Sequence, residues 1–432
     1  VYVLPEVGGK VWGAIDMSTG EEFIYKTDVL KFRNVALRGP WASGGIEFKF
    51  GIVGHTPATA TPVDYALQQH QDGSATCVVG AMDLPSRTTW RVQIHVPADG
   101  AYFETKCLWY NPTPVSQAYY NWMTAAAVAR DDLELVYPGD QYLKHAGEAR
   151  PWPQDSQGRN LKVYKNNRFG SHKSYHVVGE HADFFGGYYH DSDFGFGHWA
   201  PYVDMPGQKL WLWALSREGG VWEDLLTDTD GQYVEFQAGR MLVQYTAGQH
   251  LNPICEGSFE PYRTDRWRER WFPVKGIGGL TTASSQGAMH VSRRDELLHV
   301  GINAFEAVEG SLQVVVADRT IVSRPLKLQP TQVLKTTIPF TEDADFVVAV
   351  PEKGLRYASN RHDGKLKRPF AVDDEMAANL TETDRRLAKG MELLKARRYG
   401  QARSEFDVVI ANAPACRPAL LAIADLQYQS LI

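Results

Sequence analysis

The chain has 432 residues, with 45 Lys and Arg against 51 Asp and Glu, and 12% of its residues are aromatic. This length favours two or three domains over one. A formal net charge of -6 gives no electrostatic footprint for nucleic acid or for an anionic membrane surface, so neither partner is expected. No run of about 18 apolar residues occurs, and a membrane span is therefore not expected.

From residue 1 to about 275, short runs rich in β-formers such as TCVVGAMDL, WRVQIHV and KLWLWALS alternate with Gly, Pro, Asp and Asn. The pattern predicts one large β-sandwich with long loops and no helix, in which Gly-Gly pairs serve hairpins or bulges. Most of the 12 Trp and 20 Tyr also precede residue 275. About half of these rings suffice to fill a β core, and the others suit sugar binding, because a pyranose face packs on an aromatic ring.

A Gly-rich break at residues 275–288 precedes a second group of strands, which predicts a small Ig-like sandwich over residues 289–360. Residues 361–380 form a predicted linker. From residue 381 the apolar residues recur at helical intervals. This tail, 381–432, resembles the start of a tetratricopeptide repeat array, and the matching positions are Gly390, Leu393, Ala402, Phe406, Val409, Pro414 and Ala424.

The resemblance implies a concave groove that binds a protein partner. Because one repeat cannot bury its own apolar face, further repeats are expected beyond residue 432. The chain begins at VYVLPEVGG without Met or a signal segment, as a trimmed piece would. Its compartment, periplasm or cytoplasm of a bacterium, is therefore left open.

Cys77, Cys107, Cys255 and Cys416 are widely scattered and form no CxxC pair. A cysteine zinc site is therefore not expected, and a disulfide between Cys77 and Cys107 cannot be inferred. No Walker loop, Rossmann glycine fingerprint, G-x-S-x-G elbow or HExxH motif is present, which excludes nucleotide, serine hydrolase and zincin chemistry.

Five stretches of the first domain stand out, namely LPEVGGKVWGAIDMSTGEEFIY, LRGPWASGGIEFKFGIVGHTPATATPVDY, WYNPTPVSQAYYNWMTAAAVARDDLELVYPGD, GHWAPYVDMPGQKLWLWALS and GGVWEDLLTDTDGQYVEFQAGR. Together they resemble the galactose-mutarotase superfamily, and specifically a bacterial domain of unknown function (DUF5107-type) that occurs with C-terminal tetratricopeptide repeats. The resemblance implies a β-supersandwich with a carbohydrate site over residues 1–275.

In mutarotases a strand written roughly L-E-x-Q carries the Glu that acts as general base, and YVEFQAGR places Glu235 at that position. Gln237 lies on the same face of the strand, because side chains two residues apart point the same way. The family's general acid is a His after N-x-T-x-x-P. The matching stretch NPTPVSQAYYNWMTA has no His, and Tyr120 or a neighbour takes its place. A phenol with a pKa near 10 is a poor acid at neutral pH, which argues against plain mutarotation.

Glycoside hydrolysis needs two carboxyl groups at one sugar. Glu47 lies in WASGGIEFKFGIVGHTP, where Trp41 and His55 are expected to wall a pocket. Asp131 and Asp132 end a run of small residues, and a buried pair of this kind would raise one pKa.

A further pair begins with Glu223, beside Trp222. The stretch YYHDSDFGFGHW, which ends in His198 and Trp199, matches no metal motif and better suits hydrogen bonding to a sugar. For all of these carboxylates, a solvated face or a turn is the alternative.

We therefore expect a mainly β, carbohydrate-active enzyme, leaning to a glycoside hydrolase without metal or cofactor, in which Glu235 acts with Glu47 or Asp132. The alternatives are an aldose epimerase that uses His55 or His198 as its acid, and a glycan-binding module without catalysis. The expected substrate-binding residues are Trp41, His55, Tyr120, Trp122, Asp131, His198, Trp222, Glu223, Gln237 and Arg240.

Overall fold

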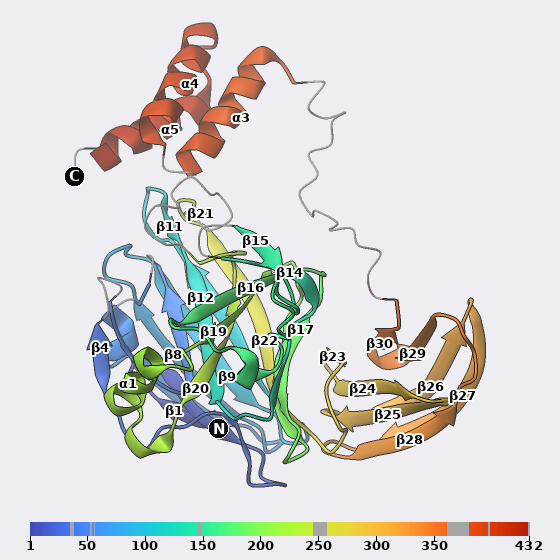
Figure 1. Cartoon of the computed structure of the whole chain (residues 1–432). Coiled ribbons are helices and arrows are strands. Elements are labelled where there is room, and N and C mark those ends of the chain that lie inside the picture. Colours follow the sequence, from blue (N-terminus) through green and yellow to red (C-terminus); the bar gives the residue numbers. More distant parts are fainter. Residues whose placement is uncertain are drawn as a thin grey trace.

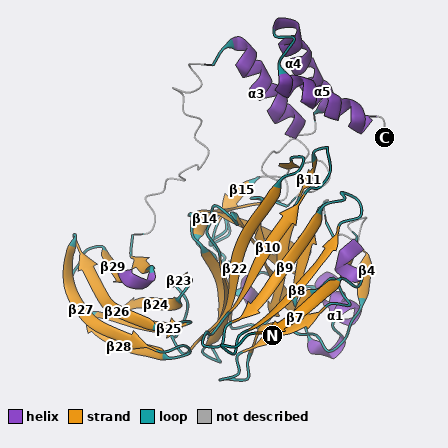
Figure 2. Ribbon diagram, turned by 180° about the vertical axis from the view of Figure 1, so that it is seen from behind, coloured by secondary structure: helices purple, strands orange, loops and turns teal. Residues whose placement is uncertain are grey.

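The computed structural model describes residues 1–34, 39–51, 54–55, 57–144, 148–244, 257–360, 380–395 and 398–430. Within these residues, the first part of the chain forms two large antiparallel sheets (Figures 1 and 2). The first sheet has ten strands, in the order β1 (Tyr2–Leu4), β2 (Lys10–Ile15), β6 (Ile46–Phe50), β12 (Asn121–Val128), β20 (Tyr233–Gly239), β19 (Gly207–Leu212), β16 (Lys173–Gly179), β14 (Gly139–Leu143) and β15 (Ala149–Pro151), with β3 (Glu22–Ile24) on β2.

The second sheet has eight strands, in the order β13 (Leu133–Val136), β17 (Phe184–Tyr189), β18 (Phe194–Trp199), β22 (Thr264–Lys275), β10 (Phe103–Tyr110), β9 (Thr89–Val96), β8 (Ala75–Met82) and β7 (Asp64–Gln69). Two small ribbons, β4 (Phe32–Asn34) with β5 (Pro40–Ala42) and β11 (Gln117–Tyr119) with β21 (Gly257–Phe259), lie outside both sheets. Cys77 on β8 and Cys107 on β10 are free thiols, separated by strand β9.

The main hydrophobic core draws buried residues from both large sheets. Strand β6 illustrates the rule that builds it: Ile46, Phe48 and Phe50 belong to this core, while Glu47 and Lys49 point the other way. The ten-stranded sheet therefore has one face against the core and a second, outer face that carries polar side chains.

One helix, α1 (Arg217–Leu226), interrupts the β pattern of this region, which the sequence led us to expect without helices. Gly219 and Gly220, expected in a hairpin or bulge, lie in its first turn. Gly219 packs so closely on the backbone of Ala214 that an added Cβ would lie 1.7 Å from its carbonyl oxygen. That prediction was wrong because this glycine pair serves close packing of a helix start rather than a turn.

A second, smaller sandwich follows, again with two antiparallel sheets. Its strands run in the orders β23 (Thr282–Ser284), β24 (Gly287–Arg294), β25 (Leu297–Ala304), β28 (Val333–Pro339) and β27 (Arg319–Leu328), β26 (Val308–Val316), β29 (Phe346–Val350), β30 (Leu355–Ala358). Strand β23 lies inside the Gly-rich stretch expected as a break. An aliphatic cluster that includes Ile302 and Val314 fills the space between the two sheets.

An apolar cluster joins the two sandwiches. Phe272 of β22 packs on Phe305, with ring centroids 4.2 Å apart. Beside this contact, Arg270 donates hydrogen bonds to Glu306 at 2.8 Å and to the carbonyl of Ser285 at 2.6 Å. The small sandwich is therefore fixed to strand β22 by packing and by a partly buried ion pair.

The last described segment is helical, with α3 (Glu382–Lys395), α4 (Tyr399–Asn412) and α5 (Arg417–Ser430). Ala402, Phe406 and Val409 form its core, and Gly390 leaves room for the ring of Phe406. This is the expected tetratricopeptide packing, in which small residues let two helices approach. None of the described helices is long and apolar enough to cross a membrane. The predicted linker, 361–380, lies outside the described residues except at Leu380.

Candidate functional site

The outer face of the ten-stranded sheet carries a row of polar side chains that crosses five neighbouring strands. Glu47 lies opposite Thr124, Thr124 opposite Gln237, Gln237 opposite Lys209, and Lys209 opposite His176. Because residues opposite one another in antiparallel strands share a face, these five side chains lie side by side.

The residues that lie two positions before or after this row on each strand form two neighbouring rows on the same face. In one of them Glu235 lies opposite Trp211. In the other, Lys49 lies opposite Trp122. The outer face thus combines two carboxylates, two indoles and several cations.

Trp122 owes its position to two glycines. A Cβ added to Gly239 would lie 2.6 Å from the indole, and one added to Gly207 would lie 2.7 Å from it. The indole therefore extends across the bare backbone of β20 and β19. It makes an edge contact with His176, whose ring centroid is 5.8 Å away.

Glu47 is held in an ion-pair and hydrogen-bond cluster. His55 Nδ1 lies 2.6 Å from Glu47 Oε1, and Lys49 Nζ lies 3.9 Å from Oε2. Burial alone would raise the pKa of Glu47, but His55, Lys49 and Lys10 outweigh burial and lower this pKa to about 2. Glu47 is therefore an ionised carboxylate at neutral pH.

His55 is oriented by the same contact. Burial lowers its pKa, although Glu47 opposes the change, so the imidazole is neutral at pH 7. With its Nδ1 proton directed to Glu47, the other ring nitrogen is an acceptor. The ring stacks on Trp41, with centroids 5.5 Å apart.

Glu235 has the opposite electrostatic character. Gln237 Nε2 donates to Glu235 Oε2 at 2.6 Å, and the Tyr233 hydroxyl donates to Oε1 at 3.4 Å. Burial raises the pKa of Glu235, and the charge of Glu47 adds to this rise against the attraction of Lys49 and Lys209. The pKa values of these two carboxyl groups on one face are thus shifted in opposite directions, down for Glu47 and up for Glu235.

Three lysines lie around these carboxylates. Lys10 donates to the carbonyls of Ala42 at 3.0 Å and Ser43 at 3.1 Å. Burial lowers its pKa to about 8, with partial opposition from Glu47 and Glu235.

The second lysine, Lys209, donates to the side-chain oxygens of Gln237 and Gln244. The third, Lys49, has Glu47 as its ion-pair partner. All three lysines are at least 95% buried.

Several buried donors on this face lack a partner in the described part of the chain. They are Trp122 Nε1, Thr124 Oγ1 and Trp211 Nε1. An unsatisfied buried polar group costs about 1–3 kcal/mol, so donors gathered on one face indicate a site for water or for a polar ligand. Glu47, Glu235, Thr124 and Trp41 line a small cavity of about 10 Å³ there, which is about the room of one water molecule.

Six of the residues predicted for the site come together on or beside this face, namely Trp41, Glu47, His55, Trp122, Glu235 and Gln237. A seventh, Trp222 of helix α1, stacks on Trp213, with ring centroids 4.9 Å apart. Trp213 in turn stacks on Trp41 at 6.3 Å. The aromatic wall of the site therefore reaches helix α1.

Other predicted residues lie elsewhere. Asp132 precedes β13 of the other sheet, where Arg130 donates to it at 2.9 and 3.0 Å and the backbone of Asp191 at 2.9 Å. Burial would raise the pKa of Asp132, but these bonds and the charge of Arg130 outweigh burial and lower this pKa. Asp131 and Glu223 line a separate shallow cleft beside α1.

The remaining three lie away from the cavity that Glu47 and Glu235 line. His198 lies in the core between the sheets, with Nε2 2.9 Å from Glu269. Arg240 Nη2 donates to both carboxylate oxygens of Asp265, at 2.9 and 2.8 Å. Tyr120 is 3% exposed and does not line the cavity beside Glu235.

Sequence reasoning missed the three lysines, Thr124 and Trp211. The sequence does contain a pattern that could have indicated most of them. Lys49 lies two residues from Glu47, and Thr124 two residues from Trp122, so each pair lies on one face of its strand. Lys209 and Trp211 alternate in the same way within KLWLW. The pairing that brings β6, β12, β20 and β19 together is long-range, however, and no local pattern gives it.

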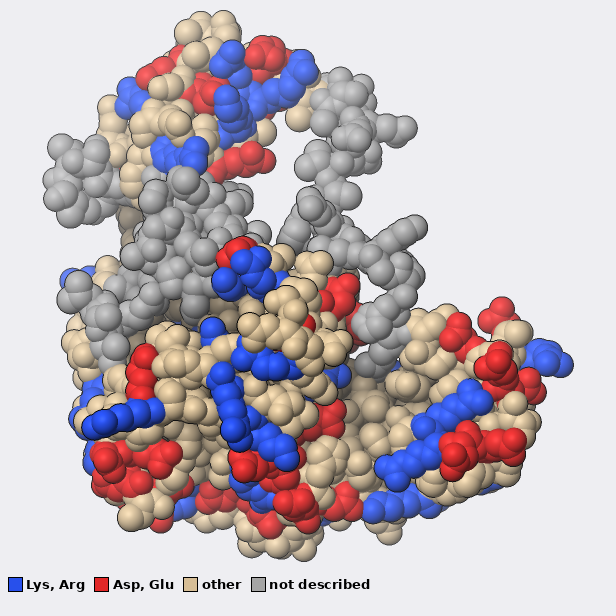
Figure 3. Space-filling model, in the orientation of Figure 1, with Lys and Arg blue, Asp and Glu red and all other residues tan. Residues whose placement is uncertain are grey.

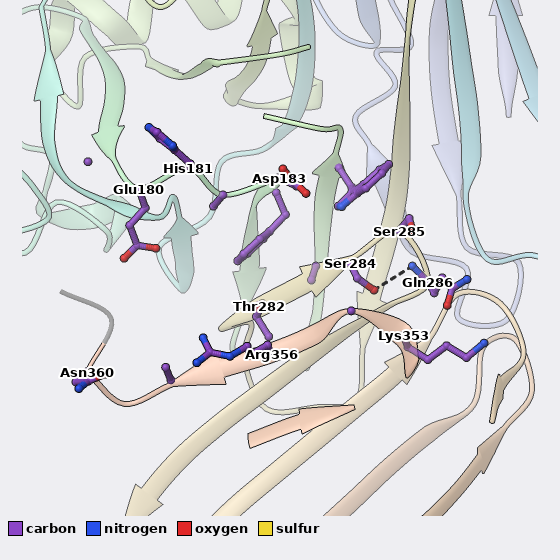
Figure 4. Close-up of a pocket in the computed structure, with 17 residues that line it drawn as sticks. Glu180, His181, Asp183, Thr282, Ser284, Ser285, Gln286, Lys353, Arg356 and Asn360 are labelled. Atoms are coloured by element: carbon purple, nitrogen blue, oxygen red, sulfur yellow. Dashed lines mark hydrogen bonds between the residues drawn. The ribbon is translucent and has the colours of Figure 1, made fainter. Parts of the chain in front are cut away.

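A larger groove of roughly 1070 Å³ lies between the two sandwiches (Figure 4). Asp183, Lys353 and Arg356 line it, and Gln286 donates its backbone N–H to Ser284 on its floor. Burial raises the pKa of Asp183, which accepts a hydrogen bond from the backbone of Tyr202. No described residue that lines this groove carries a buried polar atom without a partner, in contrast to the outer face. We therefore place the candidate site on the outer face.

In the residues that the structure describes, no three His, Cys, Asp or Glu side chains are grouped to hold a metal ion. The His and Asp residues of YYHDSDFGFGHW point to different partners. His190 contacts Glu134 at 2.8 Å, and Asp193 pairs with Lys335 at 2.8 Å. This stretch serves local structure and the contact with the small sandwich.

The two packed sheets form a large β-sandwich, followed by a small β-sandwich and a helical segment, as the sequence predicted. Residues 1–274 match the family model described as a domain of unknown function, DUF5107. The match spans more than half of the chain, and the chain belongs to this family.

Three solved structures illustrate the similarity. A TPR-domain containing protein from Parabacteroides distasonis is 22% identical with a TM-score of 0.54, over 63% of this chain and 44% of that protein. A galactose mutarotase-like protein from Clostridium acetobutylicum is 9% identical with a TM-score of 0.46, over 63% and 92%. A putative aldose 1-epimerase from Klebsiella pneumoniae is 9% identical with a TM-score of 0.44, over 63% and 76%. The chain thus spans less than half of the Parabacteroides protein.

Proposed function

We propose that the outer face is the active site of a carbohydrate-active enzyme, a glycoside hydrolase in which Glu235 is the general acid and Glu47 the ionised carboxylate. The observation that carries the proposal is that both groups line one cavity while their pKa values shift in opposite directions. Glycoside hydrolysis needs one protonated and one ionised carboxyl group at the same bond.

The surroundings support this assignment of roles. Trp41 and Trp122 are 6% and 0% exposed, and a pyranose ring can pack on these aromatic rings once the side chains that cover them move away. The free donors of Trp122 and Thr124 can bind ring hydroxyls or the glycosidic oxygen. Since the cavity holds about one water molecule, a sugar must displace side chains that line it.

The test is turnover on a panel of nitrophenyl glycosides and oligosaccharides, followed by Glu235→Gln on the best substrate. We expect this variant to lose on the order of 10²–10⁴-fold in kcat, the usual contribution of a positioned acid. Glu134→Gln is the matched control, because Glu134 is a carboxylate of the other sheet bound to His190. Full turnover in Glu235→Gln would rule out the assigned role.

A second candidate is an aldose epimerase that pairs Glu235 with His55. The 2.6 Å contact to Glu47 favours it, because that contact orients the imidazole and leaves its second nitrogen for proton transfer. Polarimetry on free aldoses separates the two candidates: an epimerase speeds the exchange of anomers without cleaving a bond. Tight glycan binding with neither activity would instead indicate a non-catalytic glycan-binding module.

For the helical segment we propose a protein partner, with the first 275 residues acting on the sugar and residues 289–360 as a separate β unit. The packing of α3 and α4 through Gly390 and Phe406 supports a repeat array, whose concave side binds peptides or proteins. A chain without residues 381–432 should keep its turnover on small glycosides. Loss of turnover would show that the helices belong to the active site.

A further inference from the structure

The outer face has more positive than negative groups. Three ammonium groups, those of Lys10, Lys49 and Lys209, lie around two carboxyl groups, and each lysine is at least 95% buried. Buried charges are normally paired. On the surface seen in Figure 3, by contrast, acidic and basic side chains are intermingled. The excess of cations is therefore a feature of the site.

Two of the three lysines have their hydrogen bonds satisfied within the protein. Lys10 is bound by the carbonyls of Ala42 and Ser43, and Lys209 by the side chains of Gln237 and Gln244. Both are anchored to structure around the site. The positive charges of Lys10 and Lys209 act on the cavity, although their ammonium groups donate their hydrogen bonds to the protein itself.

Lys49 differs from them. Its side chain is 6% exposed, and its closest ion-pair contact, to Glu47 Oε2, is 3.9 Å long, beyond hydrogen-bond distance. No described residue accepts a hydrogen bond from its ammonium group. Lys49 therefore holds a buried positive charge whose donors are left for something else.

The nearest neighbours of Lys49 have the same property. Trp122 lies directly opposite Lys49, and Thr124 follows two residues later on the same face. Trp122 Nε1 and Thr124 Oγ1 have no partner in the described chain. A cation and two neutral groups able to donate thus come from adjacent positions on one face, and Thr124 and Lys49 also neighbour the Glu47 carboxylate. This combination matches an anionic group on a polar ligand.

We propose that the site takes sugars that carry an anionic group, with Lys49 as the residue that binds the anion and Trp122 and Thr124 as its hydrogen-bonding neighbours. A uronic acid carboxylate and a sugar phosphate ester share the required chemistry. The inference rests on the proposed function, because it names the substrate class of the same site.

The test is calorimetry with matched sugars: glucose and galactose, the corresponding glucuronate and galacturonate, and the two 6-phosphates. We expect at least one anionic sugar to bind about tenfold tighter or more than its neutral parent, as a hydrogen bond to a charged group supplies. The uronates and the phosphates distinguish the two sources of the anion. Equal or tighter binding of the neutral parents would overturn the inference and leave the sugar site intact.

Variants assign the effect to Lys49. Lys49→Met should abolish the preference for the anionic sugar, measured as the ratio of the affinities for the anionic sugar and its neutral parent. Lys49→Arg keeps the charge and should keep the preference, and near-ultraviolet circular dichroism reports whether each variant is folded. Lys106→Met is the matched control, because Lys106 is half-exposed on the other sheet and paired with Glu104. A preference that survives in folded Lys49→Met would contradict the role of Lys49, and binding of no sugar at all would overturn the proposed function itself.

Discussion

The two sandwiches of this protein bury different chemistry. The small sandwich encloses an aliphatic cluster that includes Ile302 and Val314, and its few buried polar residues are uncharged. The large sandwich has an apolar core as well, but its outer face adds three buried lysines and the carboxylate of Glu47. Because buried charge is costly unless it is paired, these groups support the proposal that the outer face is the functional site.

The two regions should therefore respond differently to mutation. In the small sandwich, the loss of a side chain should reduce stability equally at every pH and leave the sugar site unchanged. On the outer face, the sign of a stability change should depend on the charge removed and on pH. The following five predictions test this contrast.

The largest stability effect is expected for Ile302→Ala. Ile302 is fully buried between the sheets of the small sandwich. Truncation to Ala leaves a cavity and should cost about 2–5 kcal/mol, measured by urea unfolding. The cost should be the same at pH 5 and pH 8, because no titratable group is involved. A sugar affinity that changed in parallel would break the separation between the two sandwiches.

Glu47→Gln should destabilise the protein at neutral pH by about 3 kcal/mol. The pKa of Glu47 is about 2 against an ordinary value of 4.5, so its ionised form stabilises the fold above pH 4.5. That contribution is lost as the pH falls from about 4.5 towards 2. The difference between wild type and variant should shrink over the same window, measured by urea unfolding at a series of pH values.

Glu235→Gln should change the stability of the protein in the opposite direction to Glu47→Gln. The pKa of Glu235 is raised by burial, so its ionisation opposes folding above that pKa and is without effect below 4.5. The variant should be more stable than wild type at neutral pH, and this gain should vanish in acid. Equal signs for the two glutamates would contradict the assignment of one acid and one ionised carboxylate.

The β class, the position of Glu235 and the helical tail could be predicted from the sequence. Period-two patterns predicted the β class, and the motif YVEFQAGR predicted the position of Glu235 on a strand. The helical interval at Gly390, Ala402 and Phe406 predicted the tail, because its contacts are local. Its packing is confirmed by the way Gly390 accommodates Phe406.

What the sequence did not give is the assembly of strands far apart in the chain. Lys49 and Lys209 share a face only because β12 and β20 lie between their strands. Asp132 was expected beside Glu235, yet its local pairing with Arg130 places it at a turn of the other sheet. Charge clusters that form across a sheet need the strand order, which no single stretch encodes.

Lys10→Met should stabilise the protein by roughly 1–2 kcal/mol at pH 7. The pKa of Lys10 is about 8 against 10.5, so below pH 8 its charge opposes folding, and this opposition fades as the pH rises from 8 to 10.5. Part of the gain is offset because the carbonyls of Ala42 and Ser43 lose their donor. Thermal unfolding at pH 7 and pH 10 measures the difference. Destabilisation at pH 7 would show that Lys10 serves mainly to hold the loop at Ala42.

The smallest effect is expected for Trp122→Phe, which removes the free Nε1 donor and part of the aromatic surface over Gly207 and Gly239. One neutral hydrogen bond is worth about 1 kcal/mol, so sugar affinity should fall roughly fivefold by calorimetry. Trp90→Phe is a close control, because Trp90 also has a buried, unpartnered Nε1 but packs on Phe50 in the core between the sheets. Trp90→Phe should lower stability and leave the affinity unchanged. If both variants weaken binding equally, the loss reflects a general destabilisation of the sandwich, and the role of Trp122 in binding the sugar is contradicted.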